Sequence, residues 1–210
     1  MSDRCVIVAG GDCTTFELQS ICENDYIIAA DSGLKVLNEN SIIPHLIVGD
    51  FDSYDGKLPK DVDIIKLPTK KNDTDLLFAA RQGVEKGFGD FLILGGYGSR
   101  PDQNFAMYQT LLWLAEQDMT ALAECCGFTA TVVNNSKISF NVADDEYLSV
   151  FSFAGVSSGV HIKNADYPLE NATLYPDFPV GVSNCKSGGG EVTVSVKNGT
   201  LLVFKLKKNI

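Results

Sequence analysis

A change of hydrophobic pattern near Gly127 restricts the possible folds of this chain more than any other property of the sequence. Before it, short apolar runs alternate with amphipathic segments, whereas after it apolar and polar residues alternate with a period of two. The first pattern is typical of an α/β unit, and the second of antiparallel strands that bury one face. We therefore predict an α/β domain with a mainly parallel sheet over residues 1–127. An all-β, sandwich-like domain is predicted over residues 128–210.

The apolar runs of the first part are almost continuous in Val, Ile and Leu, as in parallel strands covered on both faces. They predict strands over residues 5–10, 26–31, 46–50, 63–67, 91–96 and 121–126. A helix is predicted over residues 75–86, because Gly87 is a good helix stop. A second helix is predicted over residues 104–117, with Trp113 in the core. Four of its residues recur at helical spacing and should face the sheet: Phe105, Tyr108, Leu112 and Ala115.

In the second part, alternating runs predict strands over residues 129–134, 137–142, 147–153, 191–196 and 201–206. The last two flank Asn198-Gly199, a pair that favours a two-residue hairpin turn. The glycine-rich stretch 186–191 is predicted to be a flexible loop. No long helix is expected after residue 130.

The composition limits the classes of function. Net charge is −10 and no basic cluster exceeds two residues, so neither a nucleic acid nor an anionic membrane is an expected partner. No apolar run approaches the length of a membrane span, and the first residues read as a strand and not as a signal peptide. Six cysteines without CxxC spacing argue against a zinc site and predict buried, reduced thiols. We expect a cytoplasmic protein.

Acidic residues gather where the predicted elements begin or end. Asp31 ends the second predicted strand, and Asp50 and Asp52 stand at the end of the third. Asp73 lies just before the first predicted helix, and Asp75 is the first residue of that helix. Because ligands of open α/β sheets bind at the carboxyl ends of the strands, these acids should meet at one edge. Their repulsion is costly without a cation, and carboxylates are ligands of Mg²⁺, so the sequence predicts a magnesium site there.

Each acidic group alone has an ordinary explanation. The stretch "GDFDS" at residues 49–53 also suits a solvated turn, and "NDTD" at residues 72–75 also suits a helix cap. Thr74 is the expected capping residue, and the free N–H groups of that helix would favour a nearby anion. The combination of the groups is what favours the cation site.

A glycine-rich loop stands between the fifth predicted strand and the second predicted helix, in "LGGYGSRPDQNFA" at residues 94–106. Its glycines, which include Gly96 and Gly98, let backbone N–H groups approach a phosphate, and Arg100 adds a donor that is always charged. The loop is neither a Walker A box nor a full dinucleotide fingerprint, so alone it is a weak signal. Beside the carboxylates, it predicts a nucleoside triphosphate bound with Mg²⁺.

The order of these motifs resembles that of a known family. "GDFDS", "NDTD" and "GGYGSRPDQ" are similar to the motifs of thiamin pyrophosphokinase, and "YPLENATL", "GVSN" and "GTLLVF" look like its β domain. The resemblance covers almost the whole chain. It implies a nucleotide-binding α/β domain, a thiamine-binding and dimerisation domain of β-sandwich type, and a homodimer with sites between the subunits. It also implies the transfer of pyrophosphate from ATP to the thiamine hydroxyl, which gives thiamine diphosphate and AMP.

The resemblance assigns roles to individual acids. Asp50, Asp52 and Asp75 match the Mg²⁺ carboxylates, with Asp31 and Asp73 beside them. Attack on the β-phosphorus, with AMP leaving, needs mainly positioning and neutralised charge.

The resemblance also assigns residues to the two substrates. Arg100 matches the Arg of the glycine-loop motif and Asp102 the Asp that follows it, while Gln103 stands where many members have His. Ser183 and Asn184 match the Ser-Asn of the β domain, which lies close to thiamine in the partner subunit's site.

Two further residues bear on substrate binding. Asp166 stands where the family often has Lys, directly before Tyr167, the expected aromatic contact of thiamine. Lys71 could add a point charge to the triphosphate, which Arg100 and the N–H groups of the glycine loop would hold. The thiamine hydroxyl must lose a proton, and the candidates are Asp102 and an oxygen of the metal or phosphate. Asp102 is assigned to positioning before general-base work.

Two alternatives stay open on the residues themselves. An aspartate-nucleophile phosphatase would use Asp50 as nucleophile and Asp52 as acid, because such enzymes place DxD after an apolar strand. That reading leaves the glycine loop and Arg100 without a purpose. A non-catalytic nucleotide or thiamine sensor would keep the same binding residues without turnover.

Overall fold

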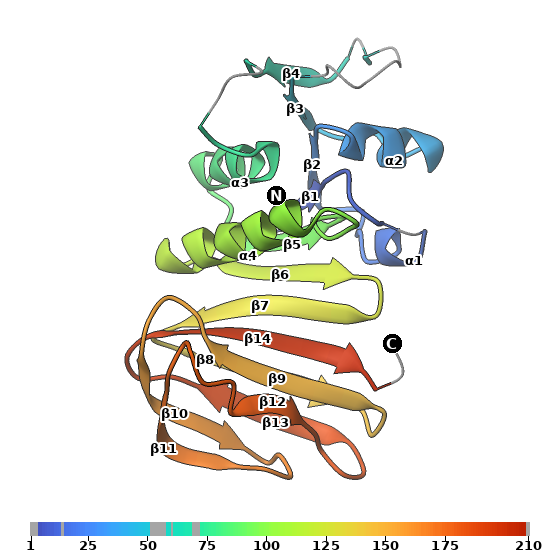
Figure 1. Ribbon diagram of the computed structural model, residues 1–210. Coiled ribbons are helices and arrows are strands. Elements are labelled where there is room, and N and C mark those ends of the chain that lie inside the picture. Colours follow the sequence, from blue (N-terminus) through green and yellow to red (C-terminus); the bar gives the residue numbers. More distant parts are fainter. Residues whose placement is uncertain (1–3, 14, 51–57, 60, 69–71, 209–210) are drawn as a thin grey trace. The chain divides into compact units, whose positions relative to one another are not determined.

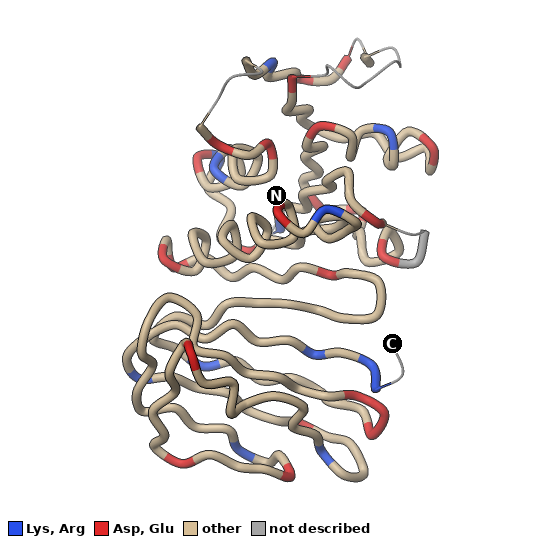
Figure 2. Tube along the Cα trace, viewed as in Figure 1, with Lys and Arg blue, Asp and Glu red and all other residues tan. Residues whose placement is uncertain are grey.

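The computed structural model describes residues 4–13, 15–50, 58–59, 61–68 and 72–208 (Figure 1). The chain divides into two compact units, Met1–Cys126 and Gly127–Ile210. The division falls where the hydrophobic pattern of the sequence changes. Among the described residues, no helix is long and apolar enough to cross a membrane. Figure 2 shows Lys and Arg spread over both units.

In the first unit, parallel strands form a sheet in the order β6-β5-β1-β2-β3-β4. Its strands are β1 (Cys5–Val8), β2 (Tyr26–Ala30), β3 (Leu46–Gly49), β4 (Asp63–Lys66), β5 (Asp90–Leu94) and β6 (Thr120–Cys125). Its helices are α1 (Thr15–Leu18), α2 (Gly33–Glu39), α3 (Asp75–Glu85) and α4 (Pro101–Glu116). The chain adds strands outward from β1 to β4 and then places β5 on the other side of β1. The direction of winding therefore reverses between β1 and β5.

Helices cover both faces of this parallel sheet, with α1 and α2 on one side and α3 and α4 on the other (Figure 1). On the first face, Val6 and Leu92 pack in one cluster with Leu34 of α2. On the opposite face, α3 lies so close to β5 that a Cβ added to Gly83 would be 2.5 Å from the Phe91 ring. Strand residues thus alternate between two buried faces, and the predicted α/β class is confirmed. The edge strand β4 is the exception, because three of its four residues are exposed.

The predicted packing face of the second long helix is wrong except at Ala115, which is buried as predicted. Helix α4 begins at Pro101 and not at residue 104, because Arg100 is its N-cap and proline is favoured at the first helical position. Phe105 is 55% exposed, and Trp113 is only partly buried, with the Arg81 guanidinium 5.5 Å from its ring centroid. The helix carries two apolar stripes, and the one that faces inward consists of Met107, Thr110, Leu111, Leu114 and Ala115.

The second unit consists of antiparallel strands in two sheets. One part has the order β12-β9-β14-β7, from β7 (Phe128–Asn134), β9 (Glu146–Ser152), β12 (Gly181–Asn184) and β14 (Thr200–Lys207). The other has the order β11-β10-β13-β8, from β8 (Lys137–Val142), β10 (Ser157–Lys163), β11 (Leu169–Leu174) and β13 (Gly190–Ser195). One apolar cluster contains residues of both, including Val150 and Val203 from the first and Val160 and Val194 from the second. The predicted β-sandwich is confirmed.

The predicted hairpin at Asn198-Gly199 is wrong. Strand β13 pairs with β8 and β10, whereas β14 pairs with β7 and β9. The Asn-Gly turn therefore carries the chain from one sheet of the sandwich to the other. Gly199 has a φ of 115° and its N–H donates to Asn135 Oδ1 at 2.9 Å. A turn signal fixes the local bend, but the pairing of its strands depends on which sheet buries their apolar faces.

Three strands of the second unit were not predicted, namely β10, β11 and β12. Strand β10 contains Gly159 with a φ of 65°, and its pairing with β11 is interrupted by register shifts. Strands β11 and β12 lie at sheet edges, and half of the residues of each are exposed. Their sequences therefore lack the regular apolar alternation by which the other strands are recognised.

Candidate active site

A cavity of about 530 Å³ lies at the carboxyl edge of the parallel sheet. Loops that follow β1, β2, β3 and β5 line it, together with the starts of α3 and α4. Ligands of open α/β sheets bind at this edge, where the direction of winding reverses. The lining residues named in the sequence analysis are Asp31, Asp50, Asp73, Thr74, Asp75, Gly96, Gly98, Arg100 and Gln103.

Backbone hydrogen bonds join the loops that follow β1 and β5 and form the floor of this cavity. The Gly11 N–H donates to Gly95 O at 2.7 Å, and the Asp12 N–H donates to Tyr97 O at 2.7 Å. A Cβ at position 11 would lie 2.4 Å from Tyr97 O, so only glycine allows this approach. The sequence analysis missed the β1 loop, although Gly10-Gly11 directly after a predicted strand was an available signal.

Three carboxylates of the lining influence one another. Asp31 has a left-handed backbone, with a φ of 48°, and its carboxylate accepts a hydrogen bond from Ser32 Oγ at 3.3 Å. Burial raises the pKa of Asp31, and the negative charges of Asp75 and Asp50 raise that pKa further. The predicted convergence of acids from separate strands is therefore present for these three side chains.

Asp73, which lines the cavity, has a cationic partner. Its carboxylate accepts a short hydrogen bond from Arg81 Nη1 on α3. The Arg81 guanidinium also lies over the ring of Trp113 on α4. Arg81 thus links α3 to α4, and its guanidinium already balances the charge of Asp73 without a metal ion.

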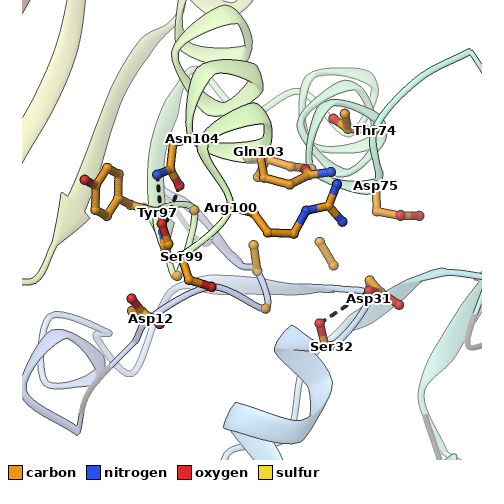
Figure 3. Close-up of a pocket in the computed structure, with 18 of the residues that line it drawn as sticks. Asp12, Asp31, Ser32, Thr74, Asp75, Tyr97, Ser99, Arg100, Gln103 and Asn104 are labelled. Atoms are coloured by element: carbon orange, nitrogen blue, oxygen red, sulfur yellow. Dashed lines mark hydrogen bonds between the residues drawn. The ribbon is translucent and has the colours of Figure 1, made fainter. Parts of the chain in front are cut away.

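Thr74 is the N-cap of α3, as predicted. Its Oγ1 accepts a hydrogen bond from the Leu77 N–H at 3.1 Å, and its own backbone is extended. Because the cap fixes where α3 begins, it also places Asp75 at the first helical position beside the cavity. Figure 3 shows Thr74 and Asp75 on the wall toward which the Arg100 side chain extends.

Arg100 lines the cavity, but its side chain is 68% exposed and forms an ion pair with Asp102. The two groups share two hydrogen bonds, Nε to Oδ1 at 3.2 Å and Nη2 to Oδ2 at 2.5 Å. This guanidinium holds the pKa of Asp102 below its usual range. Among the described residues that line the cavity, Asp102 is not included. Asp102 therefore pairs with a residue of the cavity lining but does not itself line the cavity.

The glycine loop departs in one respect from the sequence prediction. Gly96 and Gly98 both line the cavity, but the Gly98 N–H already donates to Asn104 Oδ1 at 2.8 Å. This N–H is therefore not free for a phosphate. Asn104 was missed by the sequence analysis, as were the other lining residues Asp12, Ser32, Tyr97 and Ser99.

The donor set was compared with the needs of Mg²⁺. Among the described residues, no three His, Cys, Asp or Glu side chains lie close enough together to hold a metal ion. Asp52 and Lys71 lie outside the described residues. The acids nevertheless fit Mg²⁺, which nucleotide sites bind through one or two carboxylates together with substrate phosphates. The repulsion that raises the pKa of Asp31 also fits, because a cation would relieve it.

In the second unit, Asn184 and Ser183 lie on β12, and Asn184 is buried. The Asn184 side chain accepts from the Tyr167 N–H at 3.1 Å and donates to Tyr167 O at 2.7 Å. Ser183 has a φ of 58°. Asn184 is thus occupied in holding the backbone of Tyr167, whose side chain is 69% exposed.

Asp166, at a position that is often basic in the resembling family, binds the loop that follows β12. Its carboxylate accepts from the Ser187 N–H, from Ser187 Oγ at 2.5 Å and from Cys185 Sγ at 3.3 Å. The Ser187 hydroxyl is the main cause that lowers the pKa of Asp166. The Gly188 N–H donates to Asp144, so two carboxylates hold the stretch that was predicted as a flexible loop.

Two family models match this chain in sequence order. Residues 18–123 match the thiamin pyrophosphokinase catalytic domain, and residues 135–201 match the thiamin pyrophosphokinase vitamin B1 binding domain. The chain belongs to the thiamin pyrophosphokinase family. Membership implies a transferase that uses ATP as co-substrate.

Solved thiamin pyrophosphokinase structures share this fold. The structure from Bacillus subtilis is 21% identical, with a TM-score of 0.88 over 97% of this chain and 99% of that chain. The structure from Geobacillus thermodenitrificans is 22% identical, with a TM-score of 0.83 over 98% of each chain. The yeast structure is 13% identical, with a TM-score of 0.76 over 99% of this chain and 87% of that chain. The search of curated proteins found no match.

Proposed function

We propose that the protein is a thiamine diphosphokinase, which transfers pyrophosphate from ATP to the hydroxyl of thiamine and releases AMP. The observation that carries this proposal is the composition of the cavity in a member of this family. Asp31, Asp50 and Asp75 line it together with the glycine loop and Arg100, and Figure 3 shows Asp31 and Asp75 on the side toward which Arg100 extends. The first unit would bind the nucleotide, and the second would bind thiamine and form the dimer.

Arg100 is the residue proposed to hold the triphosphate. Its guanidinium is always charged and matches phosphate oxygens with paired donors. The ion pair with Asp102 orients it in the absence of ligand. Gly96 and Gln103 line the same wall, and Lys71 is proposed from the sequence alone to add a charge. The start of α3, capped by Thr74, would favour the anion through its N–H groups.

We propose that Asp50 and Asp75, with Asp52 from the sequence, hold Mg²⁺ together with phosphate oxygens when ATP binds, and that Asp31 stands beside them. The ion would offset the charge of the phosphates. Asp73 is proposed to act mainly through Arg81, because that ion pair already balances its charge. Asp102 is proposed to position Arg100 and not to accept the thiamine proton, because its pKa is lowered and it stands outside the cavity lining.

The proposed thiamine site involves Tyr167 and Ser183 of the second unit, near the cavity of a partner subunit. The exposed face of Tyr167 suits the cationic ring of thiamine by cation–π contact. Five exposed apolar residues in the segment 167–182 of this unit support a homodimer: Tyr167, Tyr175, Phe178, Val180 and Val182. We expect Phe178→Asp to give a monomer by size-exclusion chromatography with light scattering. Val156→Asp, at an exposed apolar residue outside the 167–182 segment, is the matched control.

The decisive experiment is incubation of the protein with ATP, Mg²⁺ and thiamine, with AMP and thiamine diphosphate measured over time. Equal amounts of both products are expected. Binding of both substrates without AMP would indicate a sensor. An aspartyl-phosphate without AMP would indicate the phosphatase alternative.

A cytoplasmic location is also proposed, because none of the six cysteines, all of them among the described residues, forms a disulfide.

A further inference from the structure

We propose that Asn104 is a positioning residue, whose side-chain amide fixes Gly98 and thereby the shape of the glycine loop that faces the nucleotide. The identity of the nucleotide rests on the proposed function. The clamp itself is a property of the folded chain and can be measured without turnover.

The clamp consists of two hydrogen bonds between one side chain and one backbone residue. The Gly98 N–H donates to Asn104 Oδ1 at 2.8 Å, and Asn104 Nδ2 donates to Gly98 O at 2.8 Å (Figure 3). An amide offers one acceptor and one donor side by side, which matches the N–H and C=O of a single residue. Asp would offer acceptors only, and Leu would offer neither. The residue type at position 104 is therefore specified by the loop.

Helix α4 holds the clamp in place. Asn104 is in the first turn, and its own N–H donates to Arg100 O at 3.0 Å. Its side chain is half-buried, so little freedom remains. The amide thus transfers the fixed position of a 16-residue helix to a loop that has no regular structure of its own.

The opposite side of the loop is held by the backbone of the β1 loop. The Asp12 N–H donates to Tyr97 O at 2.7 Å, directly before Gly98. A Cβ added to Gly98 would lie 3.1 Å from Asp12 N, so the two loops are in close contact there. Without Asn104, the β1 side would still hold Tyr97, but Gly98 would lose both of its side-chain hydrogen bonds. The path from Gly98 to Arg100 would then be free to vary.

Arg100 is two residues from Gly98, so the clamp influences the position of the Arg100 backbone, from which the guanidinium extends. A pre-organised group loses little conformational freedom when the ligand binds. A phosphate-binding group that is no longer held in place therefore lowers the affinity for the ligand. We expect Asn104→Leu, which keeps the volume of the side chain, to raise the KM for ATP about tenfold or more. The KM for thiamine should change little, because no thiamine contact is assigned to this loop. A purely structural role would not produce such a split between the two substrates.

Gln109→Ala is the matched control, because it removes an amide from an exposed position of the same helix outside the cavity lining. It should leave both KM values unchanged. Asn104→Asp is the second variant and keeps the acceptor for the Gly98 N–H while losing the donor to Gly98 O. Because the Asp carboxylate also adds a negative charge to the cavity lining, its loop exchange, and not its KM for ATP, should fall between those of the wild type and Asn104→Leu.

Amide hydrogen exchange of the ATP-free protein measures the clamp directly. Loop residues 95–100 should exchange faster in Asn104→Leu than in the wild type or Gln109→Ala. Unchanged exchange would overturn the clamp. Faster exchange with unchanged binding of an ATP analogue, measured by calorimetry, would overturn the positioning role. If the wild type makes no thiamine diphosphate, the proposed function fails, but exchange and analogue binding still decide the role of Asn104. If Asn104→Leu does not fold, Asn104→Ala, which removes both hydrogen bonds without adding a charge, decides by the same two measurements.

Discussion

The acidic residues of the cavity look alike in the sequence but differ in their chemistry. Burial, and after it the charges of two other carboxylates, raises the pKa of Asp31. Asp73 is neutralised by Arg81, and Asp102 is exposed and paired with Arg100. A bound cation would relieve the repulsion around Asp31. It has no repulsion to relieve at Asp73 or Asp102, because each of these carboxylates is paired with an Arg. Asp31 and Asp73 therefore form a natural pair for comparison.

We expect Asp31→Asn to lower kcat/KM by about 100-fold or more, because it removes charge where the phosphates and their cation would sit. Asn tolerates the left-handed backbone of position 31, so the fold should be kept. Asp73→Asn should lower kcat/KM by less than about fivefold and should act mainly on stability, since it breaks a partly exposed ion pair. Steady-state rates and circular dichroism of both variants check this. Equal losses in the two variants would show that the acids share one role.

At the scale of elements, the start of α3 joins stability to the site. Thr74 caps the helix and lines the cavity. One hydroxyl therefore stabilises the end of a helix beside the acids of the cavity. We expect Thr74→Ala to lower the free energy of unfolding by about 1 kcal/mol, because the Leu77 N–H loses its acceptor. Thr74→Ser keeps the acceptor and should lose less. Urea unfolding of the three proteins measures the difference, and equal stability of Ala and Ser variants would contradict the cap.

Two cysteines of the first unit, Cys5 and Cys125, are buried in the strands β1 and β6. Burial raises the pKa of Cys5 on β1 and of Cys125 on β6 to about 12. A raised pKa means less thiolate, so at pH 8 only about one in ten thousand of these groups is reactive. We expect iodoacetamide at pH 8 to label the exposed Cys22 and Cys126 first and to spare Cys5 and Cys125 until the chain is unfolded. Peptide mass spectrometry checks the order.

Cys185 gives an internal control for the same experiment. Burial, and after it the hydrogen bond to Asp166, raises the pKa of Cys185. Its labelling should therefore be slower than that of Cys126 and should become faster in Asp166→Asn. Labelling of Cys185 at the same rate in both proteins would show that Asp166 does not control this thiol.

For the molecule as a whole, the net charge of −10 opposes the binding of ATP. We expect ATP in EDTA to bind weakly and to bind more tightly as salt rises from about 0.02 to about 0.2 M, because salt screens the repulsion. Addition of Mg²⁺ should raise the affinity about tenfold or more, since it neutralises both the acids and the phosphates. Calorimetric titration measures all three conditions. Tight binding in EDTA that does not depend on salt would contradict this account.

Much of the fold was present in the periodicity of the sequence. The continuous apolar runs predicted β1 to β6, and the alternation after Gly127 predicted five strands of the sandwich. Both patterns arise from burial, which acts on each strand separately. The pairing after Asn198-Gly199 could not be predicted, because a turn pair carries no information about which sheet its strands join. The inward stripe of α4 could not be chosen either, since both of its stripes are apolar.

By itself, the sequence determined that acids, a glycine loop and Arg100 would meet at one edge of a parallel sheet, because it shows both their side-chain chemistry and their position at the ends of predicted strands. Only the tertiary structure decided which partners those groups have. Asp73 pairs with Arg81, the Gly98 N–H donates to Asn104, and Asp102 pairs with Arg100. Such pairings depend on distances between separate elements or on the bend of a loop. Those distances exist only once the chain has packed.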